Sequence, residues 1–442
     1  MARTGTPVPP SSQADAVVCE RDQMPGQMQE QSKFIPESKR PAGHTDSQKY
    51  RIDVIRDPAS WLLLQGEWNA LFESSKCSNV FMTYAWLQTW WKHFDAGKQL
   101  LLLTARDEQD HLVGIGPFYV GTATQGPLRF RRLGFLGDTD VGSDYLGLLA
   151  APGSEESLAE QISSQLLELS ALWDYIELSD AEDTPAFAKL CSCLRDNTDS
   201  NVAFSASRCH QIALPGTFEE YLAGASSRIK SVYKRRWRSL RAEHNVAFEV
   251  LQDPEDVINN FPELIRLHAM RFDQQNKESA ILNQGVPEFQ MEAAAAIART
   301  GCARLFLLRV DGNAVAALYG FAAGNTFQYY QSGLDPDWMR VSAGKLVMGA
   351  AIEETIRCGF KVFDFLRGEE PYKTDWANGV RVTLTQRFFT KTPASRTASL
   401  VLRLRAKAGR SKRDLQAKWA PYLEKLQSGV TKPATKEKST GV

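Results

Sequence analysis

SGLDPDWMRVSAGKLVMGAAIEETIRCGFKVFDFLRGEEPYKTDW, residues Ser332–Trp376, is the stretch that decides which fold we expect. Aromatic residues predict a strand over 327–333, and Asp335-Pro336-Asp337 predicts the turn that ends it. Apolar residues at helical spacing then predict a helix from about Gly344 to Arg357, followed by a strand over Lys361–Leu366. A strand, a short loop, a helix and a strand in this order are typical of an α/β unit.

The loop that opens the predicted helix has the composition of an anion site. The first turn of a helix leaves backbone N–H groups without partners, and the helix dipole favours negative charge there. Ser342, Ala343 and Gly344 are small enough for a diphosphate to approach the backbone, and Arg340 and Lys345 flank them with positive charge. An ordinary helix start, in which the Ser342 side chain caps the first turn, explains the same residues.

Ionisable and aromatic side chains gather after the second strand. Asp364, Glu369, Tyr372 and Lys373 fall within ten residues of one another. Such residues at and beyond the carboxyl end of a strand indicate a site rather than a core. A solvated loop is the alternative interpretation.

The composition is that of a globular protein. The chain has 442 residues, which suffices for two or three domains, and its formal net charge is zero. We therefore expect no nucleic-acid partner. Seven cysteines form no CxxC pair, which argues against a metal site or a disulfide framework and indicates a reducing compartment. No apolar leader and no bilayer-length apolar run are visible, so we expect a cytoplasmic protein, with a position peripheral to the inner membrane as the alternative.

The pattern divides the chain into four parts. Residues 1–48 are rich in Pro, Gln, Ser and Gly and are predicted to be disordered. Residues 49–210 and 211–390 are predicted to be two copies of one mixed α/β unit, because the order of strands and helices recurs. Only the second copy has the small and basic loop, so we expect the cofactor site there. Residues 391–442 are predicted to form a basic helical tail that packs as a terminal helix or docks on a partner or an anionic surface.

Periodicity predicts the individual elements. Helices are expected at 61–74, 81–94, 154–169, 218–243, 261–275, 287–299 and 344–357. Strands are expected at 50–55, 100–105, 112–120, 128–136, 173–178, 305–310, 315–321, 327–333 and 361–366.

Other residue groups keep two interpretations each. Trp86, Trp90 and Trp91 either line a ligand pocket or belong to the core. The acidic residues of 138–144 either hold a metal or an amine or form a turn cluster. The basic helix 218–243 either grips phosphates or is a solvated face, and His268 is more typical of a structural histidine than of a catalytic one.

Together these segments resemble the CelD/BcsL-like acetyltransferase family of the GNAT superfamily, which is akin to the Fem peptidyltransferases. The resemblance covers about Tyr50–Phe389. It rests most on SGLDPDWMRVSAGKLVMGAAIE and FDFLRGEEPYKTDWA, and less on WLQTWWKHF, FLGDTDVGSDY and KSVYKRRWRSL. It implies a fold of mixed α/β sheets made of tandem GNAT-like units, the second of which binds acetyl-CoA or another acyl-CoA.

Superfamily members hold the diphosphate at a helix opened by a Gln/Arg-x-x-Gly-x-Gly/Ala loop. Arg340, Ser342, Ala343, Gly344 and Lys345 take that place here. The spacing differs from the family pattern, because Arg340 precedes Gly344 by four positions and a lysine follows the glycine.

Our hypothesis from the residues and the resemblance is acyl transfer from a thioester to an amine or hydroxyl. Asp364 and Glu369 are the candidate bases, Tyr372 is the candidate acid toward sulfur, and Lys373 is expected to stabilise negative charge. Backbone N–H groups of the strand 327–333 are expected to polarise the thioester carbonyl.

Two other functions remain open. One is a Fem-like transferase that uses aminoacyl-tRNA and grips it with the basic helix. The other is a non-catalytic binding module of a polysaccharide assembly. The family association implies a small-molecule or saccharide acceptor, a role in exopolysaccharide, cellulose or cell-envelope biosynthesis, and peripheral contact with an envelope-biosynthesis complex.

Overall fold

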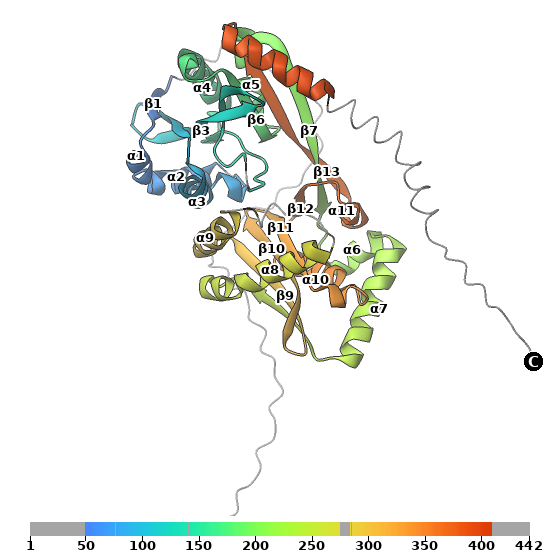
Figure 1. The fold of residues 1–442 in the computed structure, drawn as a ribbon. Coiled ribbons are helices and arrows are strands. Elements are labelled where there is room, and N and C mark those ends of the chain that lie inside the picture. Colours follow the sequence, from blue (N-terminus) through green and yellow to red (C-terminus); the bar gives the residue numbers. More distant parts are fainter. Residues whose placement is uncertain (1–48, 76, 140, 275–282, 284, 409–442) are drawn as a thin grey trace, which may run out of the picture. The chain divides into compact units, whose positions relative to one another are not determined.

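The computed structural model describes residues 49–75, 77–139, 141–274, 283 and 285–408 (Figure 1). These residues belong to one compact unit. The predictions for residues 1–48 and for the tail beyond residue 408 lie outside the described residues. Within the described ranges, no helix is long and apolar enough to cross a bilayer.

In the described part of the chain, thirteen strands form one mixed sheet. Its order is β1-β2-β3-β4-β6-β13-β7-β12-β11-β10-β9-β8, and β5 pairs with β3. The strands are β1 (Arg51–Ile55), β2 (Gln99–Arg106), β3 (Leu112–Gln125), β4 (Leu128–Phe135), β5 (Leu149–Ala150), β6 (Tyr175–Glu182), β7 (Asp199–Ala213), β8 (Val246–Leu251), β9 (Ala303–Val310), β10 (Asn313–Ala323), β11 (Thr326–Leu334), β12 (Val362–Arg367) and β13 (Gly379–Phe389).

Helices flank this sheet. They are α1 (Pro58–Leu62), α2 (Gln65–Ser74), α3 (Tyr84–Phe94), α4 (Glu155–Glu168), α5 (Pro185–Asn197), α6 (Phe218–Gly224), α7 (Ser227–Glu243), α8 (Pro254–Gln274), α9 (Val286–Arg299), α10 (Ala343–Arg357) and α11 (Pro371–Trp376). A further helix covers 393–408. We call β1–β6 with α1–α5 the first half, and β8–β12 with α6–α11 the second half.

Two strands exchange between the halves. β13, the last strand of the chain, pairs antiparallel with β6 of the first half, and β7 pairs antiparallel with β12 of the second half. β7 and β13 also pair with each other along most of their length. One ladder of backbone hydrogen bonds therefore runs through both halves, and the position 210/211 between the predicted copies falls inside β7.

Most predicted elements exist in the structure, with local differences. The helix predicted over 61–74 is broken into α1 and α2, because Leu64 N donates to Trp61 O in a tight turn. The predicted helix 218–243 likewise divides into α6 and α7. The predicted helix 344–357 is α10, one residue longer at its start.

Side chains of β10 alternate between two cores, as successive residues of a strand must. Ala317 and Tyr319 join a core that includes α8, α9 and most of the first half. Leu318 joins the core formed with α7 and α10. In the first of these cores, the rings of Trp86 and Phe289 meet edge to face with centroids 5.2 Å apart. Trp86, Trp90 and Trp91 are all buried there, so the core interpretation of these tryptophans is confirmed.

Candidate active site

The neighbouring strands β11 and β12 diverge. They pair in parallel only from Thr326 opposite Val362 to Gln328 opposite Asp364. β11 continues to Leu334 and β12 to Arg367 without a shared register. At the end of β12 the backbone of Arg367 turns to the first half, where its N–H donates to Asp144 Oδ2 at 2.8 Å. The end of β11 lines two cavities, and the end of β12 lines one of them.

The first, which we call the helix cavity, has a volume of about 320 Å³ and lies at the start of α10. Ser342, the residue before α10, has a left-handed backbone (φ 63°), and its side chain makes no capping hydrogen bond. In the part of the chain that the structure describes, the N–H groups of Ala343 and Gly344 have no hydrogen-bond partner. The alternative in which the Ser342 side chain caps the helix is therefore wrong, and the amide of Gly344, which lines the cavity, stays available to an anion.

The predicted anion-binding residues divide into three groups. Ser342, Gly344 and Lys345 line the helix cavity, and Lys345 Nζ lies 3.8 Å from a carboxylate oxygen of Asp375. Ala343 is fully buried in the core and does not line the cavity. Arg340 is exposed and lies outside the lining of this cavity.

The second, which we call the junction cavity, has a volume of about 290 Å³. Residues of β11, β12 and α8 line it together with the loop 141–144 of the first half. Arg271, Tyr329, Ser332 and Tyr372 line both cavities. Their polar groups are in contact: the Tyr329 hydroxyl lies 2.6 Å from Ser332 Oγ and 3.2 Å from the Tyr372 hydroxyl, and Arg271 donates to Ser332 Oγ at 3.0 Å. The two cavities thus meet at a wall of hydroxyl groups.

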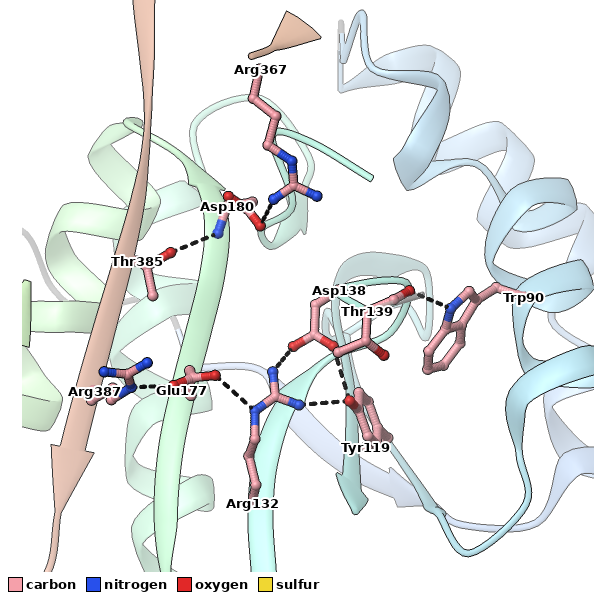
Figure 2. A network of polar contacts seen from close by, with 10 residues as sticks. All are labelled: Trp90, Tyr119, Arg132, Asp138, Thr139, Glu177, Asp180, Arg367, Thr385 and Arg387. Carbon is pink, nitrogen blue, oxygen red and sulfur yellow. Dashed lines mark hydrogen bonds and ion pairs between the residues drawn. The ribbon is translucent and has the colours of Figure 1, made fainter. Parts of the chain in front are cut away.

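Asp144 supplies a carboxylate to the junction cavity. It is 1% exposed, accepts from the Arg367 backbone, and forms an ion pair with Arg367 Nε at 3.0 Å. Burial raises the pKa of Asp144 to about 7, although the guanidinium of Arg367 acts in the opposite direction. Arg367 also pairs with Asp180, as Figure 2 shows. A carboxyl group with this pKa can both take up and release a proton near neutral pH.

Unusual backbone conformations surround this ion pair. Tyr145 (φ 58°), Asp180 (φ 51°) and Leu366 (φ 56°) are left-handed although none is glycine. Each such residue costs roughly 1 kcal/mol or more and persists only where the surroundings hold it. Because all three lie beside Asp144 or Arg367, the strain supports a functional interpretation of the ion pair.

The predicted catalytic residues are not all brought together. Asp364 is buried and accepts hydrogen bonds from Tyr145 Oη at 2.8 Å, Gln211 Nε2 at 2.6 Å and Leu366 N at 2.7 Å. Burial raises the pKa of Asp364, but its side chain faces these partners and lines neither cavity. Glu369 is exposed and also lines neither.

Tyr372 and Lys373 do lie at the cavities. Tyr372 lines both, and burial raises the pKa of its hydroxyl, which keeps it protonated at neutral pH. Lys373 lines the junction cavity, where its Nζ donates to Arg367 O at 2.8 Å and pairs with Glu370 at 3.0 Å. The structure therefore groups Tyr372 and Lys373 with Asp144 rather than with Asp364.

His268 also lines the junction cavity, a position that the sequence pattern did not predict. Its Nδ1–H donates to the carbonyl of Ser332 at 2.9 Å, and its ring stacks on Phe272. Burial lowers the pKa of His268 to about 4, so the ring is neutral near pH 7. The hydrogen bond fixes the tautomer with the proton on Nδ1.

The corresponding region of the first half is packed with polar side chains. β4 and β6 pair in parallel only over Arg132–Leu133 and Tyr175–Ile176. Figure 2 shows the Arg132 guanidinium between Asp138, Tyr119 and Glu177, with Tyr119 Oη at 2.6 Å and Glu177 at 3.2 Å. Asp138 is thus committed to an ion pair inside the first half. Among the described residues no group of His, Cys, Asp or Glu is arranged to hold a metal ion, and Asp140 lies outside the described residues.

Comparison with known proteins identifies the domain. A family model described as an acetyltransferase (GNAT) domain matches residues 227–374. FemX, a solved structure, is 12% identical, with 76% of this chain and 98% of that chain covered and a TM-score of 0.54. The structure of L-PGS from Bacillus licheniformis (10% identity, 76% and 95% covered) has a TM-score of 0.45. A tandem GNAT protein from the clavulanic acid biosynthesis pathway (10% identity, 76% and 98% covered) has a TM-score of 0.37. No curated protein matches the chain.

The matched range holds β11, α10 and β12, and with them the helix cavity. The chain thus carries a GNAT-type acetyltransferase domain and is an acyltransferase enzyme. The predicted fold, mixed α/β with tandem GNAT-like units, is confirmed. The narrower assignment to the CelD/BcsL-like family stays a prediction.

Proposed function

We propose that this acyltransferase takes an acyl group from acetyl-CoA or another acyl-CoA and transfers it to an amine or hydroxyl. In this proposal the helix cavity receives the donor and the junction cavity receives the acceptor. The observation that carries it is the shared wall: Tyr329, Ser332, Tyr372 and Arg271 line both cavities. Because the two cavities share these residues, a donor and an acceptor bound in them are held next to each other, which lowers the entropy cost of their encounter.

The residues of the helix cavity fit an acyl-CoA. The unpaired amide of Gly344 and the Lys345 ammonium suit a diphosphate. Apolar side chains such as Leu334 and Met348 line the rest and suit a mostly apolar arm. Beyond Gln328 the edge of β11 that faces β12 is unpaired in the ladder, so its backbone groups can hold amides of such an arm.

The side chains at the wall can move the two protons that acyl transfer requires. The acyl thioester supplies an activated carbonyl carbon. Asp144, deprotonated, accepts a proton from the acceptor in the junction cavity. Tyr372, held protonated, donates toward the leaving sulfur from the same wall. Arg271 provides a fixed positive charge beside both.

For the acceptor we propose a saccharide or a similar hydroxylated or amine-bearing compound of exopolysaccharide or envelope biosynthesis. The polar lining of the junction cavity, with Asp144, Arg367, Glu370 and Lys373, supports a polar acceptor. The biosynthetic role, the cytoplasmic position beside the inner membrane and the contact with an envelope complex rest on the family resemblance alone.

A transferase that uses aminoacyl-tRNA is the second candidate. It is supported by α7, which exposes Lys230, Lys234, Arg235, Arg238 and Arg241. RNA phosphates bind such a row of cations, with strong dependence on salt.

Calorimetric titration of the full chain tests these candidates. We expect heat of binding with acetyl-CoA, and an affinity about tenfold lower in Lys345→Ala because one charged phosphate contact is lost. Failure of every acyl-CoA to bind, together with salt-sensitive binding of charged tRNA, would favour the second candidate. Binding of neither would refute both candidate donors.

A further inference from the structure

A third cavity, of about 840 Å³, lies between α7 and the C-terminal part of α10, from Ala350 to Arg357. We call it the α7 groove. Lys234, Trp237, Arg238 and Arg241 line it from α7, while Glu353 and other residues line it from α10. None of its lining residues lines the helix cavity or the junction cavity, so it is a separate site.

The groove carries a net positive charge. Lys234, Arg238 and Arg241 are exposed, and among the described residues none of the three forms an ion pair. They follow one another at helical spacing and span about 10 Å along α7. On the opposite wall, Arg357 is neutralised by Glu354 at 2.7 Å. Glu353, which accepts a hydrogen bond from the Tyr233 hydroxyl at 3.3 Å, is the remaining carboxylate of the lining.

Aromatic side chains shape the floor and order one of the cations. Tyr233, Trp237 and Phe248 line the groove. The guanidinium carbon of Arg241 lies 4.6 Å from the centre of the Trp237 ring, so a cation–π contact restricts its orientation. A guanidinium held in this way loses little freedom when its N–H groups bind a phosphate. The volume lies within the range of about 300–1,000 Å³ typical of small-ligand sites.

Gly349 allows the two walls of the groove to approach closely. A Cβ atom at Gly349 would come within 2.3 Å of the Tyr233 ring, so a larger residue would push α7 away from α10. The close packing at this point holds the two walls of the groove together.

We propose that the α7 groove binds a small phosphate-bearing ligand that also carries a hydroxylated or aromatic ring. The phosphates lie against Lys234, Arg238 and Arg241, and a ring hydroxyl donates to Glu353. The position of Glu353 favours this ligand over a polyanion, because a carboxylate in the wall repels a continuous row of phosphates but accepts a hydrogen bond from a hydroxyl. The inference concerns a second site and does not depend on the reaction at the first.

The test is calorimetric titration of the full chain with pyrophosphate, glucose 1-phosphate and adenosine diphosphate. We expect binding of a ring-bearing probe, tighter than that of pyrophosphate, and an affinity at least about tenfold lower in a Lys234→Ala/Arg238→Ala variant. The matched control is Lys230→Ala/Arg235→Ala, which removes two exposed cations of the same helix from outside the groove and leaves the affinity unchanged. Thermal unfolding verifies that both variants fold. Preference for glucose 1-phosphate identifies a sugar phosphate, and preference for adenosine diphosphate identifies a nucleotide.

Lys345→Ala separates the α7 groove from the helix cavity, which also offers a phosphate site. Binding that survives this substitution but is lost in Lys234→Ala/Arg238→Ala supports the proposal. Binding lost in Lys345→Ala alone would assign the ligand to the helix cavity. Equal loss in both α7 variants would show non-specific attraction to a basic helix, and binding of an RNA oligonucleotide with none of the three probes would show a polyanion surface. Each of these results, like the absence of all binding, overturns the inference.

Discussion

Replacing Asp144 by asparagine should remove the proton acceptor of the junction cavity while keeping the shape of the side chain. Asp144 is almost fully buried, and its carboxylate lines the cavity that we assign to the acceptor. Loss of a general base typically lowers kcat by about 100-fold to 10,000-fold. We expect a loss in this range, with little change in the affinity for acetyl-CoA, because Asp144 does not line the helix cavity.

The pH dependence of kcat/KM is a more specific test of this base than the loss of kcat. With a pKa of about 7, Asp144 is roughly one-tenth deprotonated at pH 6 and roughly nine-tenths at pH 8. Only the deprotonated carboxylate can accept a proton, so kcat/KM of the unmodified enzyme should rise about tenfold between pH 6 and pH 8 and then level off. In the Asp144→Asn variant, kcat/KM should be low and should not rise between pH 6 and pH 8.

The assay follows thiol release from acetyl-CoA in the presence of amine and hydroxylated acceptors. Asp138→Asn is the matched control, because burial also raises the pKa of Asp138, to about 6, but its carboxylate pairs with Arg132 and lines neither cavity. That variant should keep the rise between pH 6 and pH 8. A flat profile for the unmodified enzyme, or an Asp144→Asn variant that retains the slope, would refute the assignment of the base.

Four further outcomes follow from the same geometry. Arg340→Ala should leave acetyl-CoA affinity within about twofold by calorimetry, whereas Lys345→Ala weakens it about tenfold, because only Lys345 lines the helix cavity. Tyr372→Phe keeps the ring in both cavities but removes the hydroxyl, so steady-state kinetics should show kcat lowered by about tenfold or more with KM nearly unchanged. Gly333→Ala places a Cβ within 2.6 Å of a backbone nitrogen of α8, and urea denaturation should show a loss of about 1–3 kcal/mol in the free energy of unfolding. Asp364→Asn disturbs three buried hydrogen bonds, so it should lower that free energy by about 1–3 kcal/mol while kcat of the folded enzyme changes little.

The elements that local pattern decides could be predicted from the sequence. α10 and β12 follow from helical and strand periodicity bounded by turn residues, and the structure places both within a residue or two of the prediction. Neither β7 nor β13 is among the predicted strands. DSNVAFSASRCHQIA has no regular alternation of polar and apolar residues, whereas GVRVTLTQRFF alternates over 380–385 and could have been predicted. They are strands because each finds partners far away in the chain, such as Leu384 opposite Ala206. For β7 this tertiary pairing outweighs a weak local pattern.

The same distinction divides the candidate site. Ser342, Gly344, Lys345, Tyr372 and Lys373 lie close together in the chain, so a local motif could find them. The place of Asp144 depends on a hydrogen bond with a residue 223 positions away, which no motif encodes. The acidic loop FLGDTDVGSDY indicates that a carboxylate here could belong to a site. The sequence does not distinguish Asp144 from the other carboxylates of this loop.

The prediction of Asp364 as a base rests on its position near the end of a strand. That position does not determine which way the side chain points. Asp364 stands near the end of a strand that lines the junction cavity, as the pattern predicts. Its side chain, however, is directed to Tyr145 and Gln211. Gln211 belongs to β7, the exchanged strand, so the partner that holds Asp364 is itself absent from the local pattern. Which face of a strand looks into a cavity depends on its neighbours in the sheet.

The strand exchange also explains why the two halves act as one site. The domain match ends at residue 374, before β13, and begins after β7. Without these strands β12 would lose its antiparallel neighbour, in which Ile212 lies opposite Phe363, and would become an exposed edge. The same β12 ends in Arg367, which holds Asp144 of the first half at the junction cavity. The first half is therefore needed in the proposed reaction as well as in the sheet: it supplies the carboxylate of Asp144, and the exchanged strands hold β12, whose Arg367 contacts that carboxylate.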